Sequence, residues 1–435
     1  MSKLQMENCK FIRYLKLLHI ALLLIATFTA KAVTLEEAIE SAIKNDSALR
    51  SSKFNQLATE ENLVIARSRF LPQISLQGSS NQLTQTTTQD LPNGGSSSRS
   101  FTGPSVNHQF VIRQALLRPK ELSSLRYAEI QAQYMELKYR YDVADLKSKV
   151  INAWIDLLGA ELIAQAYERP LQYMNKAAMQ ERAKYQVGDG TKDATMEAEV
   201  MYKSANSSYL QALETLKAKK NAFEKLTRIS ASEMTANKLE LEPVPVVLDL
   251  KKAEVLENLI NKSIELQMAK LQELMQLERI KMAEADHKPT LDLMVGLNLA
   301  QNDATSTQGY QYKNRQLGVQ YTLPLYSGGG ISSAIKQAYF SSESSKYETD
   351  ALLQKIQIEF ENNWSQLVGL AIRQNASYES LKSSDEQIKA TGRFTDLGVK
   401  TVGDLALIET SYSRRLIDLI SYSQDYLRVK YKLKL

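Results

Sequence analysis

The sequence predicts a mostly helical, mixed α/β chain made of two internal repeats, each with a helix, two strands and a long helical hairpin. Three observations predict this fold. Two halves of the chain align with each other, short segments alternate apolar and polar residues, and long segments carry apolar residues at steps of three and four. The chain of 435 residues is long enough to bury a core, and its 17 Gly and 9 Pro are too few for a many-turn β-protein.

The composition argues against several kinds of site. One Cys and three His leave little room for a disulfide framework, a Cys/His zinc site or a His-based metal cluster. No Gly-rich phosphate loop or serine elbow is present, so we predict no catalytic residue, no metal and no cofactor. The net charge is +5, but residues 1–32 contribute +4 of it. The rest of the chain therefore gives no sign of the basic face of a nucleic-acid-binding protein, and we predict no nucleic-acid partner.

Residues 1–32 are predicted to be an export signal that is cleaved after Ala32. Lys10, Arg13 and Lys16 precede an apolar run at 17–28, and an A-x-A site follows at 30–32. The alternative is a retained membrane anchor, but the apolar run is too short to span a bilayer comfortably. No later segment has the ~20 apolar residues of a membrane helix. A location in a membrane would therefore require a β-barrel.

The internal repeat divides the chain into 33–241 and 251–435, with a Pro-containing linker at 242–250. An offset of 217 pairs Pro72 with Pro289, and an offset of 210 pairs Trp154 with Trp364, which are the only two Trp. The two offsets differ by seven residues. We assign this difference to one polar loop that is longer in the first copy, because loops tolerate changes in length.

Each repeat opens with a helix that is followed by two strands. In the first copy the helix is expected at about 35–69, with Thr34 as N-cap and Glu37 three residues on, and Pro72 ends it. Strands are expected at about 72–84 and 105–115, and at about 290–300 and 316–326, because apolar residues recur at every second position. The polar stretch at 79–105 is predicted to be a solvent-exposed loop. The alternative for each strand pair is a soluble hairpin packed on a helix.

Long helical hairpins follow the strands. The first runs from about 120 to 187, and a helix of these 68 residues spans about 100 Å. Its apolar residues recur at coiled-coil spacing, and Pro170 is expected to kink or break it. The chain turns near Gly188 and returns over about 193–227. The second copy turns near Gly398 and returns to the C-terminus.

Four strands cannot close a membrane barrel, so several chains must contribute strands to one barrel. Two copies would give eight strands and a filled interior, and three copies would give twelve strands and a lumen. The long hairpins would then surround the same axis as a helical barrel.

The ordered motifs resemble the TolC-type outer-membrane efflux proteins. The residues that carry the resemblance are the opening at 34–39 (TLEEAI), the helix-to-strand junction at 66–76 (ARSRFLPQISL), the strand exit at 323–330 (LPLYSGGG), and the tips at 185–193 (YQVGDGTKD) and 393–405 (RFTDLGVKTVGDL). The resemblance covers essentially the whole chain after residue 32.

The resemblance implies a homotrimeric exit duct in the outer membrane. Its twelve-stranded barrel, set in outer-membrane lipid, would continue as a long α-helical barrel in the periplasm. Its partners would be a periplasmic adaptor (membrane fusion protein) and an inner-membrane transporter, which supplies the energy. The cargo would be small toxic molecules or a type I secreted protein, and the chain would not be an enzyme.

The resemblance also implies roles for residues at the tips. Asp404 matches the acidic residue that constricts the periplasmic entrance, and Asp193 is the nearest acid in the first tip. A ring of such carboxylates favours cations and raises the carboxylate pKa by repulsion between like charges. The alternative is that Asp404 caps the returning helix. A second acid of the family pattern is replaced by Leu407, and the position matching Asp404 in the first tip is Ala194.

The adaptor contacts implied by the resemblance lie at matching positions of the two tips. Gly188 and Gly398 have a second explanation, because glycine commonly ends a helix. The implied contact residues are Val187, Gly188, Thr191, Leu397, Gly398 and Thr401.

Two other functions share parts of this pattern. A periplasmic coiled-coil structural or adaptor protein would share the export signal and the helices, but it would not need the paired strands. A secreted enzyme has no obvious catalytic site in this sequence.

Overall fold

A computed structural model describes residues 34–231, 239, 241–246, 252–302 and 310–433. The predicted signal peptide and residues 247–250 of the predicted linker lie outside these residues. The chain divides into two compact units. The first comprises the described parts of 1–49, 143–259 and 357–435, and the second those of 50–142 and 260–356.

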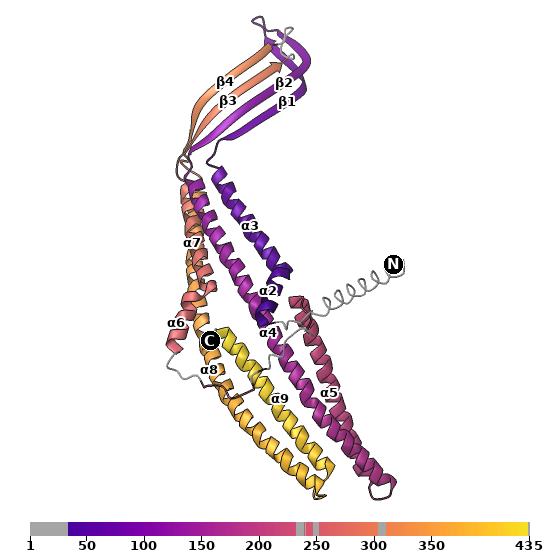
Figure 1. Ribbon diagram of the computed structural model, residues 1–435. Helices are drawn as coiled ribbons and strands as arrows, with labels where there is room; N and C mark the ends of the chain where they lie inside the picture. Colours follow the sequence, from indigo (N-terminus) through magenta and orange to yellow (C-terminus); the bar gives the residue numbers. More distant parts are fainter. Residues whose placement is uncertain (1–33, 232–238, 240, 247–251, 303–309, 434–435) are drawn as a thin grey trace, which may run out of the picture. The chain divides into compact units, whose positions relative to one another are not determined.

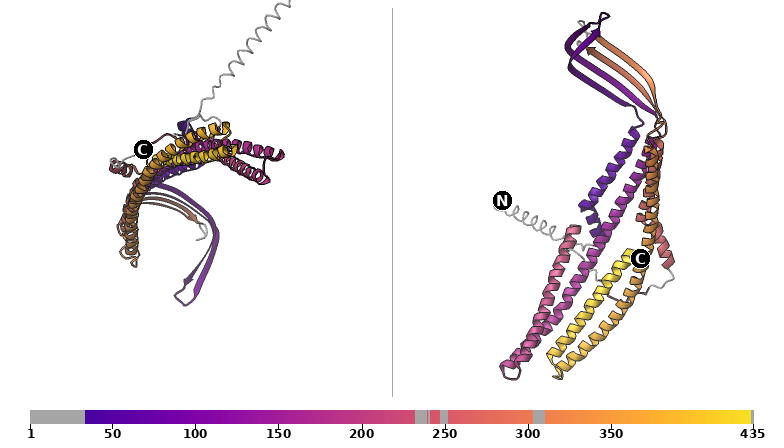
Figure 2. Two further views of the ribbon diagram at one scale, coloured as in Figure 1. Left: turned by 90° about the horizontal axis from the view of Figure 1, so that it is seen from below. Right: turned by 180° about the vertical axis from the view of Figure 1, so that it is seen from behind.

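The second unit contains one antiparallel sheet with the strand order β1-β2-β3-β4 (Figure 1). The strands are β1 (Gln73–Asp90), β2 (Ser96–Leu117), β3 (Thr290–Asn302) and β4 (Tyr310–Thr322). They curve together as a single layer (Figure 2). Among the described residues, β1 and β4 are the two edges of the sheet.

The strand register gives the sheet one apolar and one polar face. One row of residues directly opposite each other across the four strands is apolar: Ile74, Ile112, Val295 and Leu317. A row on the other face is polar: Gln77, Gln109, Asn298 and Asn314. Ile74 and Leu317 at the two edges are 63% and 75% exposed, so the chain alone does not cover the apolar face.

The first strand pair is longer than the sequence predicts. Most of the stretch 79–105, expected to be a loop, belongs to β1 and β2, and only residues 91–95 connect them. Hydroxyl groups bond across the pair here, with Thr84 2.9 Å from Thr102 and Thr86 3.1 Å from Ser100. These residues are exposed as predicted, but Thr is β-branched and cross-strand hydroxyl pairs stabilise strands. The second pair also differs, because β4 begins at 310 and ends four residues before the predicted limit.

The opening helix of each repeat is two helices and not one. Helices α2 (Leu35–Asn45) and α3 (Ser47–Ser68) meet at Asp46, whose carboxylate accepts a hydrogen bond from the Leu49 N–H at 2.6 Å. Helices α6 (Lys252–Lys262) and α7 (Ile264–Ala285) meet at Ser263, whose hydroxyl accepts from the Leu266 N–H at 3.2 Å. Asp46 and Ser263 are equivalent in the repeat, and both are residue types that favour the start of a helix.

The long hairpins consist of α4 (Pro119–Gln186) with α5 (Lys192–Thr227), and of α8 (Gly330–Asp396) with α9 (Val402–Leu433) (Figure 1). In the second unit, ion pairs join α4 to its neighbours: Arg69 to Glu121 at 2.7 Å and Lys120 to Asp286 at 2.7 Å. In the first unit, Trp154 lies edge-on to Phe223 with ring centroids 5.8 Å apart.

Pro170 was expected to kink or break its helix, and a break is contradicted because α4 continues through it; the kink stays a prediction. Proline has no N–H, so the Ala166 carbonyl one turn earlier loses its partner within the helix. The hydroxyl of Ser413 on α9 donates to that carbonyl at 2.5 Å, and both residues are buried. The fold therefore supplies the missing hydrogen bond from a neighbouring helix.

No helix in the described part of the chain is both long enough and apolar enough to cross a membrane.

Candidate functional site: the two hairpin tips

The two tips of the hairpins are built alike. At the first, the Asp189 N–H donates to the Lys184 carbonyl at 2.9 Å, and the Gly188 N–H donates to the Tyr185 carbonyl at 3.1 Å. At the second, the Val399 N–H donates to Phe394 at 2.9 Å, and the Gly398 N–H donates to Thr395 at 3.0 Å. This pair of bonds is the Schellman motif.

Both tip glycines adopt a backbone conformation that other residues rarely adopt. Gly188 has φ +83° and Gly398 has φ +74°, and nothing lies within 4 Å of the place of a Cβ at either residue. The glycines are therefore required by the backbone turn rather than by a close neighbour. The helix-ending role expected as the alternative for these residues is present.

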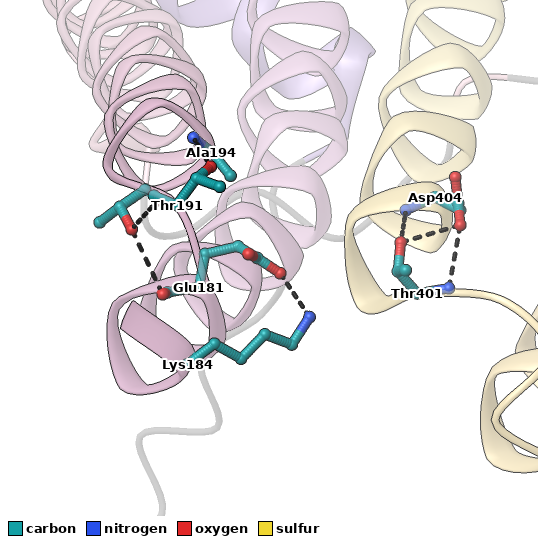
Figure 3. Close-up of polar contacts among 7 residues, drawn as sticks. Glu181, Lys184, Thr191, Ala194, Thr401 and Asp404 are labelled. Atoms are coloured by element: carbon teal, nitrogen blue, oxygen red, sulfur yellow. Dashed lines mark hydrogen bonds and ion pairs between the residues drawn. The ribbon is translucent and has the colours of Figure 1, made fainter. Parts of the chain in front are cut away.

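The start of each returning helix is capped by a threonine. The Thr191 hydroxyl accepts from the Ala194 N–H at 3.2 Å, and the Thr401 hydroxyl accepts from the Asp404 N–H at 3.1 Å (Figure 3). Asp404 completes a reciprocal cap, because its carboxylate accepts from the Thr401 N–H at 2.9 Å and from the Thr401 hydroxyl at 2.8 Å. The first tip has Ala194 at this position and lacks the reciprocal bond.

The cap affects the charge of Asp404. The hydrogen bonds from the Thr401 backbone and side chain stabilise the carboxylate and hold the pKa of Asp404 below its usual value. Asp404 is therefore ionised at neutral pH in the single chain. Asp193 lies exposed in the first turn of α5, one residue out of register with Asp404.

Side-chain contacts near the ends of α4 and α5 stabilise the first tip. The Thr195 hydroxyl donates to the Glu181 carbonyl at 3.3 Å, which joins α5 to α4. The Glu181 carboxylate pairs with Lys184 at 2.7 Å (Figure 3). These bonds fix the side-chain positions around the turn.

Apolar side chains project from both turns. Val187 is 80% exposed, Leu397 is 74% exposed and Val399 is 71% exposed. Val187 and Leu397 were singled out in the sequence, whereas Val399 was not. Val399 could have been identified from its position directly after the turn glycine, because a side chain there points away from the helix that has just ended. Exposed apolar residues gathered at a turn are typical of a protein contact.

No group of three or more His, Cys, Asp or Glu side chains suited to a metal ion occurs among the residues that the structure describes. The tips thus expose apolar side chains for contact with another molecule. They also carry capped helix starts and the separate carboxylates of Asp193 and Asp404.

Comparison with protein families identifies one matching model. The model of the outer membrane efflux protein family matches residues 38–227 and 255–434, and one segment falls within each repeat.

Several curated proteins are similar over nearly the whole chain. The proteases secretion protein PrtF of Dickeya chrysanthemi is 24% identical over 93% of this chain and 88% of its own. The outer membrane protein TolC of Vibrio cholerae is 24% identical over 89% of this chain and 85% of its own.

Solved structures share the fold. The CmeC outer membrane channel of Campylobacter jejuni has a TM-score of 0.73 at 15% identity, over 91% of this chain and 83% of its own. The open-state MtrE outer membrane channel of Neisseria gonorrhoeae has a TM-score of 0.72 at 19% identity, over 92% of this chain and 88% of its own.

Proposed function

Because the chain belongs to the outer membrane efflux protein family, we propose that it is the trimeric outer-membrane exit duct of a tripartite export system. The observation that carries the proposal is the match of both repeats to this family, in a chain whose sheet has an uncovered apolar face and two edges. The proposed duct receives cargo in the periplasm and releases it outside the cell.

The sheet supports a barrel shared between copies. An edge with unpaired backbone groups is not tolerated in lipid, so β4 of one copy must pair with β1 of the next. Three copies then give twelve strands, enough for a lumen. The row containing Val295 would face lipid, and the row containing Asn298 would face the lumen. A coiled-coil adaptor without a barrel, the main alternative, leaves this two-faced sheet without a role.

The tips support two roles at the periplasmic entrance. The exposed Val187 and Leu397, together with Gly188, Thr191, Gly398 and Thr401, would contact the periplasmic adaptor. Asp404 and Asp193 would constrict the entrance where copies meet. The inner-membrane transporter would supply the energy, so the chain needs no catalytic residue.

The relatives support two classes of cargo. One relative is named for the secretion of proteases, and the matching family is named for efflux. We propose that the cargo is either small toxic molecules or a type I secreted protein.

The experiment begins with the full chain expressed with its first 32 residues. Outer membranes are extracted with detergent, and the mass of the particle is determined by native mass spectrometry. A particle of three chains that each begin at Val33, and that conducts ions in a planar bilayer, is the expected result. A chain that stays monomeric and soluble without detergent contradicts the duct.

A further inference from the structure

A cavity lies where the sheet meets α3 and α4, within the second unit (Figure 1). It has a volume of about 760 Å³. Its walls are the end of α3, the adjoining parts of β1 and β2, the start of α4 and one residue of β3. A volume of this size accommodates a small organic molecule.

Three arginines line the cavity, and two of them are paired with carboxylates. Arg118 donates through its Nε and Nη2 atoms to the two carboxylate oxygens of Asp292, at 2.9 and 2.6 Å. Arg69 donates to the Glu121 carboxylate at 2.7 Å. Among the residues that the structure describes, Arg113 has no hydrogen-bond or ion-pair partner. The cavity therefore keeps one positive charge that the chain does not balance, and the N–H groups of this guanidinium can donate to a ligand.

The strand register places Arg113 on the polar face of the sheet. It lies opposite Gln73 on β1 and Met294 on β3, and Gly318 follows in the same row on β4. The Gln73 side-chain amide donates to the Ser68 carbonyl at 2.8 Å, which ties it to the end of α3. None of these row neighbours carries a negative charge, so none of them competes with an anion for the guanidinium.

The rest of the lining is mainly apolar, with two amides. Ile65, Val111 and Met294 supply the apolar surface, and Ile65 is 56% exposed. Gln77 and Gln109, which lie opposite each other on β1 and β2, supply the amides. An apolar lining with a few polar groups is the usual composition of a site for a small organic molecule.

We propose that this cavity binds a small organic anion. Arg113 holds its oxyanion group, which is a carboxylate, sulfonate or phosphate, and the apolar side chains hold its body. The planar guanidinium matches two oxygens of such a group.

The place of this site in transport rests on the proposed function, in which the polar face of the sheet surrounds the lumen. Each copy then contributes one cavity to the route of the cargo. Three copies bring three Arg113 side chains to the same level of the duct. A ring of arginines favours anions, so this level would select the opposite charge to that favoured by a ring of Asp404 carboxylates.

The test is isothermal titration calorimetry of the detergent-extracted full chain with naphthalene-2-sulfonate. We expect saturable binding, and Arg113→Gln should weaken it roughly tenfold or more, because hydrogen bonds to a charged group are lost. Arg113→Lys keeps the charge and should bind more tightly than Arg113→Gln. Arg113 is exposed, so unfolding temperatures measured by circular dichroism should be unchanged in both variants.

Two controls separate the oxyanion from other causes of binding. Naphthalene-2-sulfonamide has the same apolar body without the charge, so it should bind roughly tenfold or more weakly. Arg99→Gln removes an exposed arginine from the same face of β2 outside the cavity, and it should leave the affinity unchanged. Equal affinity of the wild type and Arg113→Gln, or of the sulfonate and the sulfonamide, overturns the proposal.

Conductance in planar bilayers separates this proposal from that of the duct. The sulfonate is expected to lower the ion current of the wild type and to have little effect on Arg113→Gln. If the wild type conducts ions and does not bind the sulfonate, the anion site is wrong while the duct stands. If Arg113 is needed for binding and the chain conducts no ions, the site stands while the duct fails. A conducting chain whose current the bound sulfonate leaves unchanged contradicts the place of the site in the lumen.

Discussion

The hydroxyl of Ser413 donates a hydrogen bond to the carbonyl oxygen of Ala166, the acceptor that Pro170 leaves without a partner in its own helix. The bond spans 247 positions of the chain and joins two hairpins in the first unit. A proline within a long helix thus becomes a point of attachment for a neighbouring helix, because a buried carbonyl without a partner is costly.

Replacement of Ser413 by Ala is expected to lower the free energy of unfolding by about 1–3 kcal/mol, because it leaves the buried Ala166 carbonyl without a donor. Pro170→Ala restores an N–H to that carbonyl, so the double variant is expected to recover part of the loss. Thermal unfolding followed by circular dichroism measures both. If Ser413→Ala lowers the free energy of unfolding equally in the Pro170 and Pro170→Ala backgrounds, the Ala166 carbonyl is not the reason for the loss.

The stability is expected to depend on pH through Glu409. Burial raises the pKa of Glu409, and the nearby Arg169 lowers it less than burial raises it, while Asp385 adds to the rise. A carboxyl with a raised pKa in the folded state contributes stability below its ordinary pKa and loses it as the pH rises through the raised value. The unfolding temperature of the wild type is therefore expected to fall relative to Glu409→Gln as the pH rises from acidic to neutral.

Arg169→Gln provides the matched comparison for Glu409. It removes the cation that favours the ionised carboxylate, so the loss of stability with rising pH is expected to be larger than in the wild type. If the unfolding temperature of the wild type instead rises relative to that of Glu409→Gln as the pH rises, the ion pair with Arg169 outweighs the effect of burial on Glu409.

The main features of the fold could be predicted from local patterns, whereas features set by distant partners could not. The repeat, the two proline-ended helices and the glycine tips follow from residue types at fixed spacing. The length of β1 depends on hydroxyl pairs such as Thr84 with Thr102, which only the register reveals. The continuity of α4 depends on Ser413, far away in the chain. At the tips, Asp404 could be placed as a cap from its residue type, but the capping hydroxyl of Thr401 was not predicted, and the exposure of Val399 depends on the turn itself.

The charge and the cap of Asp404 can be separated by two substitutions. Asp404→Asn keeps an oxygen that accepts from Thr401 but removes the charge, whereas Asp404→Ala removes both. If Asp404 constricts the entrance, Asp404→Asn is expected to lower cation preference in planar bilayers with little change in unfolding temperature. Asp404→Ala is expected to do the same and also to lose about 1 kcal/mol of stability. Unchanged selectivity in both variants would leave Asp404 as a cap alone.

The exposed apolar residues of the tips are expected to decide binding of the adaptor. Leu397→Asp and Val399→Asp place charges where an apolar contact is proposed, so pull-down of the adaptor expressed with the chain should fall at least tenfold. Both side chains are largely exposed, so the unfolding temperature should stay within experimental error. Phe54→Asp, at an exposed position on α3, is the control for an added charge on the surface. Binding that survives both tip variants would place the adaptor contact elsewhere.

Two equivalent glycines are expected to respond differently to the same substitution. Gly159→Ala displaces the Gln424 amide from the Ile155 carbonyl, so it should lower stability by roughly 1–2 kcal/mol despite the gain in helix propensity. Gly369→Ala meets no atom within the chain and should leave the folding of one copy intact. Because Ala favours a helix interior over Gly by about 1 kcal/mol, this variant should instead raise the unfolding temperature, as measured by circular dichroism. Equal effects of Gly159→Ala and Gly369→Ala on the unfolding temperature would mean that the packing of Gln424 against Gly159 contributes little to stability.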